Sequence, residues 1–150
     1  MDLILWRHAE AEGGGPDLER RLTSKGRKQA ARVAEWLQRR LPSKYTVLAS
    51  PARRARETAQ ALGVAFKTVA ELAPGASVEK IIEAAHWPER KKPVIVVGHQ
   101  PDLGCAAAYL VSSTRAEWSI KKGGLWWLES RVRNAKAQLV VRAVTAPDLL

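Results

Sequence analysis

Apolar residues gather along the chain in six short runs that have the length and composition of β-strands. The clearest run is Val94–Val97, whose consecutive β-branched residues are typical of a central strand covered on both faces. The last two runs are separated by a turn around Asn134, which favours an antiparallel pair at the edge of a sheet. In chain order, the predicted strands span residues 3–6, 45–49, 65–69, 94–97, 125–129 and 138–144.

Between these runs, apolar residues recur at the spacing of amphipathic helices. In chain order, the four predicted helices lie between Thr23 and Arg40, Ser50 and Leu62, Ser77 and Pro88, and Pro101 and Val111. Thr23, Ser50 and Ser77 are residue types preferred at helix N-caps, and Pro51 suits the first position of a helix. Strands that alternate with helices indicate an α/β fold with a mostly parallel sheet.

The length of 150 residues is ordinary for one domain, and no linker, internal repeat or low-complexity tract divides the chain. We therefore expect a single domain over residues 1–150. The first apolar run is broken at Arg7, unlike a signal peptide, and no segment is long enough to span a membrane. Cys105 is the only cysteine, which excludes an intrachain disulfide and suits a reducing compartment. These features predict a cytoplasmic protein with no membrane partner.

Basic residues outnumber acidic ones, with 25 Lys and Arg against 15 Asp and Glu and a net charge of +10. Such an excess favours an acidic partner, a nucleic acid or an anionic surface, or it simply confers solubility. The net charge alone does not distinguish among these four explanations. The positions of the polar residues relative to the predicted strands are more informative.

Polar residues follow three of the predicted strands at the point where each strand ends. Arg7 and His8 follow the first strand. Ser50 follows the second, with Arg54 one helical turn later, and His99 comes just after the most apolar strand. Because ligands bind where the carboxyl ends of parallel strands meet, we expect the two histidines and two of the arginines to line one pocket. Guanidinium groups offer a charged, planar fork of donors, so this pocket suits an anion and phosphate in particular.

His8 is the stronger candidate for a nucleophile because it ends the first strand beside Arg7. A neutral imidazole nitrogen can attack phosphorus and form a phosphohistidine that water then hydrolyses. Arg7, Arg54 and His99 would supply donors to the equatorial oxygens of the transferring phosphoryl group. The N-termini of the helices after Ser50 and after Gly98 would add backbone N–H donors and a favourable dipole. This chemistry requires no metal ion.

Several of these residues also have a simpler structural interpretation. A single histidine after a strand is more often structural than catalytic, and only the two histidines together favour catalysis. Arg54 lies between Arg53 and Arg56, in a basic run of the kind that usually forms a solvated helix face. Spacing alone therefore barely separates Arg54 from its neighbours. His86 lies at a predicted helix end and is expected to be a cap or a surface residue.

Three of these motifs resemble, in order and position, those of the histidine phosphatase superfamily, also called phosphoglycerate mutase-like. They are Arg7-His8-Ala9, Ser50-Pro51-Ala52-Arg53-Arg54-Ala55-Arg56-Glu57-Thr58 and Gly98-His99-Gln100-Pro101. The short chain and two further segments resemble the SixA-type phosphohistidine phosphatase branch of that superfamily. The segments are Arg21-Leu22-Thr23 leading to Gly26, and Glu71-Leu72-Ala73-Pro74. The resemblance covers nearly the whole chain and weakens after about Thr114.

The resemblance implies a three-layer α/β/α sandwich with a mostly parallel central sheet and antiparallel edge strands. It also implies a cofactor-independent phosphatase in which His8 is the phosphorylated nucleophile. Arg7 and Arg54 would hold the phosphate, and His99 would bind and polarise it from the opposite side. In the family pattern the arginine lies three positions after Ser-Pro, which identifies Arg54 within the basic run. Ala9 stands where the family most often has glycine, a change that a small side chain should tolerate.

The general acid is the clearest departure from the family. The phosphoglycerate mutase branch takes this carboxylate from a longer insertion that has no counterpart here, so Glu10, Asp17 and Glu71 remain unassigned candidates. Asp17 ends the glycine-rich loop 12–17, which leaves the predicted pocket beside His8 and is expected to form its rim or a flap. An alkoxide leaving group needs a proton, and general-acid help is worth about 10²–10⁴-fold. The leaving group of a phosphoramidate departs more easily, so the missing general acid favours phosphohistidine as substrate.

These observations favour a phosphohistidine phosphatase that acts on histidine-containing phosphotransfer or similar signalling proteins. The alternative enzyme is a phosphatase for a small phosphate monoester, in which one of the three carboxylates acts as acid. The alternative from another class is a basic nucleic-acid-binding module, which predicts a continuous basic face and strongly salt-dependent binding. Because the residues instead predict one focused pocket, we expect a phosphorylated protein or small molecule as partner, and no nucleic acid.

Overall fold

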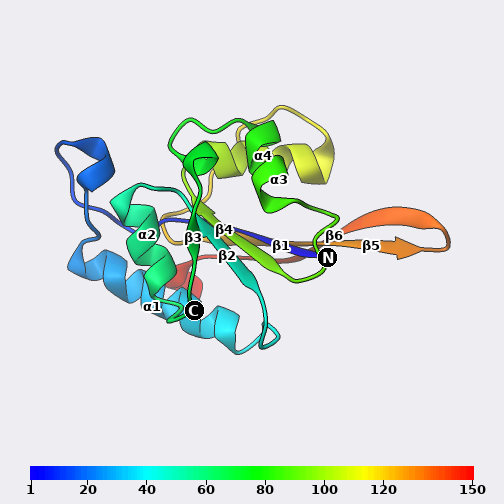
Figure 1. Ribbon diagram of the computed structural model, residues 1–150, viewed down its shortest axis with the longest axis horizontal. Coiled ribbons are helices and arrows are strands. Elements are labelled where there is room, and N and C mark those ends of the chain that lie inside the picture. Colours follow the sequence, from blue (N-terminus) through cyan, green and yellow to red (C-terminus); the bar gives the residue numbers. More distant parts are fainter.

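A computed structural model describes residues 1–150, which form a six-stranded sheet with helices packed against it (Figure 1). The strands are β1 (Asp2–Arg7), β2 (Thr46–Ala49), β3 (Lys67–Thr68), β4 (Val94–Gly98), β5 (Leu125–Arg133) and β6 (Lys136–Thr145). The α-helices are α1 (Ser24–Gln38), α2 (Arg53–Gln60), α3 (Val78–Ala85) and α4 (Asp102–Ser112). Three short 3-10 helices are η1 (Asp17–Glu19), η2 (Ala70–Leu72) and η3 (Pro147–Leu149). None of the helices is both long enough and apolar enough to cross a membrane.

The order of the strands across the sheet is β3-β2-β4-β1-β5-β6. The first four run parallel to one another, whereas β5 and β6 are antiparallel to their neighbours. Arg7 at the end of β1 lies opposite Gly98 of β4, and Ala49 at the end of β2 lies opposite Val97. The sheet thus brings the three predicted polar segments to one edge. The predicted α/β fold with antiparallel strands at one side of the sheet is confirmed.

Helices cover both faces of the sheet, so the predicted three-layer arrangement is also confirmed (Figure 1). Successive residues of a strand point to opposite faces. In β1, Ile4 and Trp6 face the core under α1 and α2, while Leu3 and Leu5 face the core under α3 and α4. All four of these side chains are fully buried. Removing such apolar surface from water, at about 25 cal/mol per Å², is the main force that holds the layers together.

Two of the three predicted helix caps are confirmed. The hydroxyl of Thr23 accepts the N–H of Gly26 at 2.9 Å, and the hydroxyl of Ser77 accepts the N–H of Lys80 at 3.2 Å. The predicted cap at Ser50 is wrong, because α2 begins only at Arg53 and its N-cap residue makes no side-chain cap bond. The hydroxyl of Ser50 is instead directed to the functional site.

The predicted ends of several elements also need correction. The third strand is reduced to Lys67–Thr68, and the last two strands extend past their predicted ends to form a long hairpin. The hairpin turns at Asn134 and Ala135, both with positive φ, as a two-residue hairpin turn requires. Beyond Ser130 it pairs only with itself and its residues are largely exposed, so no apolar alternation marks it in the sequence. His86 ends α3 in the left-handed conformation, which confirms its predicted place as a cap.

Candidate active site

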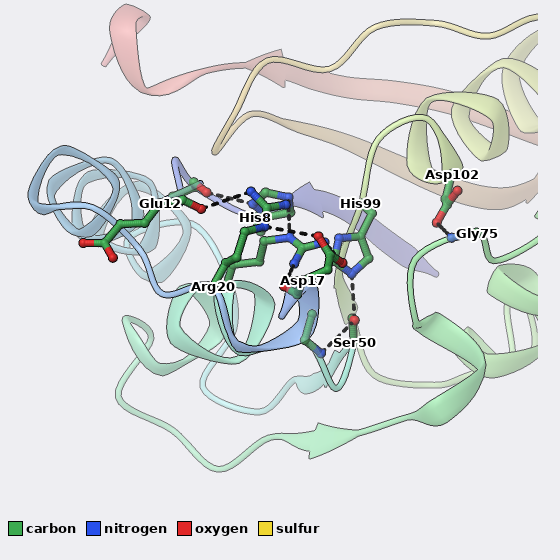
Figure 2. Close-up of polar contacts among 11 residues, drawn as sticks. His8, Glu12, Asp17, Arg20, Ser50, Gly75, His99 and Asp102 are labelled. Atoms are coloured by element: carbon green, nitrogen blue, oxygen red, sulfur yellow. Dashed lines mark hydrogen bonds and ion pairs between the residues drawn. The ribbon is translucent and has the colours of Figure 1, made fainter. Parts of the chain in front are cut away.

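His8 follows β1 at the carboxyl edge of the sheet and lies at the centre of a group of polar side chains (Figure 2). Its backbone N–H donates to the carbonyl of Gly98 at 3.0 Å, which keeps the chain beside β4 after β1 ends. The ring Nδ1 lies 2.7 Å from the carbonyl oxygen of Ala9. Because a carbonyl only accepts, Nδ1 carries the proton of the neutral ring and Nε2 keeps its lone pair. The local backbone therefore selects the tautomer that a nucleophilic Nε2 requires.

Arg54 lies in the first turn of α2 and meets the unprotonated nitrogen of His8. The distance from Arg54 Nε to His8 Nε2 is 3.3 Å, and the Arg54 side chain is only 4% exposed. Its neighbours in the basic run turn elsewhere, since Arg53 pairs with Glu57 and Arg56 donates to a backbone carbonyl. Of these three arginines, only Arg54 lines the cavity beside His8.

His99 follows β4, and its ring centroid lies 5.2 Å from that of His8. Nε2 of His99 lies 2.7 Å from the hydroxyl oxygen of Ser50, which also accepts the N–H of Ala52 at 3.2 Å. With Ser50 as the donor, the neutral His99 ring carries its proton on Nδ1. That atom is buried and has no partner in the protein, so it is available to donate to a bound oxyanion.

Arg7 ends β1, and its side chain is held by the segment that precedes β5. Nη1 of Arg7 donates to the carbonyl of Ile120 at 2.6 Å, and its backbone N–H donates to the carbonyl of Gly124 at 2.9 Å. The side chain of Gln100 fixes the same segment through the carbonyl of Trp118 at 2.7 Å and the N–H of Ile120 at 3.3 Å. Nε of Arg7 is buried without a partner, and burial lowers the pKa of Arg7.

The four predicted residues surround one cavity of about 400 Å³, large enough for a phosphoryl group and the side chain that carries it. The lining residues are Arg7, His8, Ala11, Arg20, Arg54, Pro74, Gly75, His99, Gln100, Pro101, Asp102 and Lys122. Asp102 is the only carboxylate among them, and it already accepts the N–H groups of Gly75 at 2.9 Å and Ala76 at 3.1 Å. Burial raises the pKa of Asp102. The cavity is therefore strongly cationic.

Burial and the nearby cations keep both histidines neutral near pH 7. Burial lowers the pKa of His8 to about 4, opposed by the hydrogen bond to Ala9 and assisted by the charges of Arg54 and Arg7. Burial also lowers the pKa of His99 to about 3, with further lowering by His8 and Arg54. Neutral rings can attack phosphorus or donate to its oxygens without first losing a proton.

The loop after β1 reaches the cavity through Asp17 and Arg20, which places it at the rim as expected (Figure 2). The backbone carbonyl of Asp17 accepts Nη1–H of Arg54 at 2.8 Å, and its carboxylate lies 3.3 Å from Nη2. Arg20 donates to the same carboxylate at 3.1 Å. Burial acts to raise the pKa of Asp17, but Arg54 and Arg20 outweigh it and the pKa is lowered. Asp17 thus occupies guanidinium donors that a bound phosphate would use.

Glu10, Asp17 and Glu71 are the candidate general acids. Of these, only Asp17 has a carboxylate that contacts a side chain lining the cavity, that of Arg54. The carboxylate of Glu10 accepts the hydroxyl of Thr23 at 2.8 Å, at the start of α1. Glu71 is exposed in η2. Neither Glu10 nor Glu71 lines the cavity.

Sequence reasoning does not identify every residue that builds the cavity. The additional residues are Arg20, Ser50, Gln100, Asp102 and Lys122. Ser50 and Gln100 lie inside the quoted motifs, so their adjacency to predicted site residues is a usable signal. Arg20 and Lys122 lie in loops, whose course no hydrophobic period predicts. No group of three or more His, Cys, Asp or Glu side chains lies where it could hold a metal ion.

An α/β sheet that gathers two neutral histidines and several cations at the carboxyl ends of its strands defines an oxyanion-binding protein of the phosphoryl-transfer class. Residues 3–77 match the model of the histidine phosphatase superfamily, branch 1. The chain is also 32% identical, over 151 aligned residues, to an uncharacterised protein of Picosynechococcus sp., covering 91% of this chain and 90% of that protein. The chain therefore belongs to the histidine phosphatase superfamily.

Solved structures extend the similarity over nearly the whole chain. A protein of Nakamurella multipartitia that is assigned as a phosphohistidine phosphatase SixA is 25% identical to this chain. Its structure matches with a TM-score of 0.79, covering 97% of this chain and 95% of that one. The protein histidine phosphatase SixA in complex with tungstate has a TM-score of 0.80 at 22% identity, covering 99% of both chains. A phosphoserine phosphatase from Entamoeba histolytica shares the fold with a TM-score of 0.71 at 15% identity, covering 97% of this chain and 96% of that one. These similarities confirm the predicted fold and agree with the SixA-type branch.

Proposed function

We propose that the protein is a metal-independent phosphohistidine phosphatase that uses His8 as its nucleophile and acts on phosphorylated histidines of phosphotransfer proteins. The observation that carries this proposal is the tautomer of His8, whose Nδ1–H donates to the Ala9 carbonyl while Nε2 faces Arg54. Membership of a phosphatase superfamily supports the reaction, and the similarity to SixA-type proteins supports the substrate.

In the first step, the lone pair of His8 Nε2 attacks phosphorus, and the bond between phosphorus and the substrate's histidine nitrogen breaks. The electron pair of that bond stays on the departing imidazole, which takes a proton from water. Arg7, Arg54 and Nδ1–H of His99 donate to the equatorial oxygens as charge spreads over them. The phosphoryl group displaces Asp17 from the Arg54 guanidinium when it binds. The Ala9 carbonyl stabilises the positive ring of phosphorylated His8.

In the second step, a water molecule attacks the phosphorus of phosphorylated His8. The bond from phosphorus to Nε2 breaks, its electron pair returns to Nε2, and the proton released by the water passes to solvent. Inorganic phosphate leaves, and His8 is again neutral, with the proton on Nδ1 still donated to the Ala9 carbonyl. Splitting one displacement into two in this way is the advantage of a covalent intermediate.

The leaving group supports phosphohistidine as substrate. An alkoxide needs a proton donor in the transition state, and the one carboxylate that lines the cavity, Asp102, is engaged by two backbone N–H groups. An imidazole leaves with far less help. The site is thus better suited to a phosphoramidate than to an alkyl phosphate.

The test compares turnover of a phosphohistidine-containing phosphotransfer protein with turnover of a panel of phosphate monoesters, with and without a chelator. We expect phosphohistidine and activated aryl phosphates to react about 10²-fold or more faster than alkyl phosphates, which is the scale of missing general-acid help. The chelator should have no effect. Equal rates on alkyl phosphates, or a metal requirement, would overturn the proposal.

The nucleophile is tested by His8→Ala, which should abolish turnover, because the lone pair of His99, the other imidazole at the cavity, is engaged by the Ser50 hydroxyl. His86→Ala is the matched control, since His86 is exposed at the end of α3, outside the cavity. Rapid quenching with labelled substrate should trap an acid-labile, base-stable phosphoryl group on His8. A phosphoryl group on serine, or activity retained by His8→Ala, would point to a different mechanism.

The second candidate function is a phosphatase for a small phosphate monoester, with Asp17 as general acid. The observation that favours it is the 3.3 Å contact between the Asp17 carboxylate and Arg54, which places one acid beside the site. Against it, the same contact lowers the pKa of Asp17, so the carboxylate holds a proton poorly near neutral pH. The two functions are separated by Asp17→Asn, which should slow the turnover of alkyl phosphates only if Asp17 is the general acid.

A further inference from the structure

A second cavity of about 440 Å³ adjoins the first and shares two of its lining residues, Arg7 and Lys122. Because Arg7 ends β1, the two cavities lie side by side at the carboxyl edge of the sheet. The second cavity is built from the start of α1, the segment before β5, and η3. Its lining residues are Arg7, Lys25, Gln29, Lys121, Lys122, Pro147 and Asp148.

The second cavity carries four cationic side chains and one carboxylate. Asp148 pairs with Lys121 at 3.0 Å, whereas Lys25 and Lys122 form no ion pair within the chain. The first turn of α1, which contains Lys25, has no acidic residue to offset the charge. Such uncompensated positive charge beside the phosphoryl site attracts a second anionic group of the same substrate.

The geometry points to an accessory subsite in this second cavity, which we propose binds acidic side chains that flank the phosphohistidine of a protein substrate. The inference rests on the proposed function, because it places the substrate's histidine in the first cavity. A phosphoryl group held between His8 and Arg54 would then bring neighbouring residues of the substrate against Lys25 and Lys121.

The chemistry of the lining favours carboxylates on a protein surface over a second phosphate of a small molecule. Arg7 is the only guanidinium in the second cavity, and the phosphoryl group in the first cavity already uses it together with Arg54. The remaining cations are lysines, point charges on flexible stems that accept carboxylates at varied positions, whereas paired phosphate recognition favours arginine forks. Lys121 is 73% exposed, so it can reach a partner that stays outside the cavity. None of the lining residues is a large apolar side chain that would hold a base or a ring.

The test uses two synthetic phosphohistidine peptides of equal length, one with glutamates and one with glutamines beside the phosphohistidine. For the unmodified protein, we expect kcat/KM for the glutamate peptide to be about 3- to 10-fold higher at low salt, the range expected from a few partly exposed ion pairs. The preference should disappear at about 1 M salt, where the screening length falls to roughly 3 Å. In Lys25→Gln/Lys121→Gln, the ratio of the two kcat/KM values should fall towards one.

The matched control is Lys28→Gln/Lys80→Gln, which removes the same charge from two exposed lysines that line neither cavity. The control should keep the preference, and losing it there as well would reduce the effect to net charge and overturn the subsite. Equal kcat/KM for both peptides with the unmodified protein would overturn the subsite while leaving the proposed function in place. If neither peptide is cleaved, the proposed function fails, and the subsite fails with it. If the peptides show no preference but pyrophosphate inhibition depends on Lys25 and Lys121, the cavity instead binds a second phosphoryl group.

Discussion

At the scale of single residues, the protonation state of His8 decides whether its ring can act as the proposed nucleophile. The ring is buried and faces Arg54, which lowers the pKa of His8 from 6.5 to about 4. In the folded protein, we therefore expect the imidazole NMR signals of His8 to titrate with a midpoint near pH 4. After unfolding in urea the midpoint should return to about 6.5, the value of an unperturbed histidine. A midpoint near 6.5 in the folded state would contradict the buried, neutral ring.

The lowered pKa of His8 also makes the stability of the folded protein depend on pH. The folded state binds a proton on His8 less readily than the unfolded state does, so stability is fully present above pH 6.5 and is lost as the pH falls towards about 4. His99, with a pKa lowered to about 3, acts in the same direction over a wider range. Mild acid should therefore weaken the fold while the histidines at the site are still neutral in the folded molecules.

Ser50 orients His99, and its removal should lower activity without damaging the fold. Ser50→Ala deletes the 2.7 Å hydrogen bond to Nε2 of His99, leaving the ring free to adopt the other tautomer. We expect kcat/KM to fall about 10-fold, which is the loss of roughly 1.4 kcal/mol, the scale of one hydrogen bond. Ser77→Ala is the control, because that serine caps α3 and lies outside the cavity. Its variant should lower the melting temperature with no change in kcat/KM, and a similar pattern for Ser50→Ala would rule out the orienting role.

At the scale of elements, the loop that contains η1 contacts Arg54 through Asp17 and would compete with the proposed phosphoryl group for this side chain. Asp17 is 60% exposed, so its ion pair with Arg54 is worth at most about 1 kcal/mol. Asp17→Asn weakens this competition, and inorganic phosphate should then inhibit up to about 5-fold more tightly, as that energy allows. Turnover of a phosphohistidine peptide should change little.

The alternative role of Asp17 makes the opposite prediction for alkyl phosphates. If Asp17 were the general acid, Asp17→Asn would lower their turnover by about 10²–10⁴-fold. Glu71→Gln is the control, because Glu71 is exposed in η2 and does not line the cavity. If Asp17→Asn but not Glu71→Gln greatly lowers the turnover of alkyl phosphates, the protein is a phosphatase for small monoesters rather than for phosphohistidine.

The elements themselves show what a sequence can and cannot predict. The Val94–Val97 run identifies β4 because a strand buried on both faces has no polar positions to interrupt it. Ser50 is misassigned because the same hydroxyl that suits a helix cap also suits a bond to a histidine. The residues around Ser50 in the sequence do not distinguish a helix cap from a hydrogen bond to a histidine. Only the pairing of β2 with β4, which is a long-range contact, brings Ser50 beside His99.

At the scale of the whole molecule, the sheet determines which chain segments meet. The motif residues at three strand ends could be predicted to converge, since parallel strands share one carboxyl edge. Arg20 and Lys122 could not, because each lies in a loop whose position depends on contacts made elsewhere. Lys122 follows the segment fixed by Arg7 and Gln100, and no periodic pattern records such contacts.

The register of the sheet also places the outer half of the β5–β6 hairpin far from the site. Asp2, at the amino end of β1, lies opposite Glu129 of β5 in the sheet. Residues beyond Ser130 therefore extend past this end of β1, away from the end that leads to His8 (Figure 1). That part of the hairpin pairs only with itself, and Val132 is 75% exposed. A hairpin without a packed face is marginally stable by itself and contributes little to the rest of the fold.

We therefore expect that the outer hairpin can be removed at little cost. Replacing residues 132–137 with Asn-Gly joins Arg131 to Gln138, which lie opposite each other and have the same pairing phase as the residues that flank the native two-residue turn. The free energy of unfolding, measured by urea denaturation, should change by less than about 1 kcal/mol, and kcat/KM should be unchanged. As a control, Leu128→Ala in the fully buried part of β5 should cost about 2–5 kcal/mol. A loss of that size in the trimmed protein, or a fall in its turnover, would mean that the outer hairpin supports the site despite lying at the far end of the sheet.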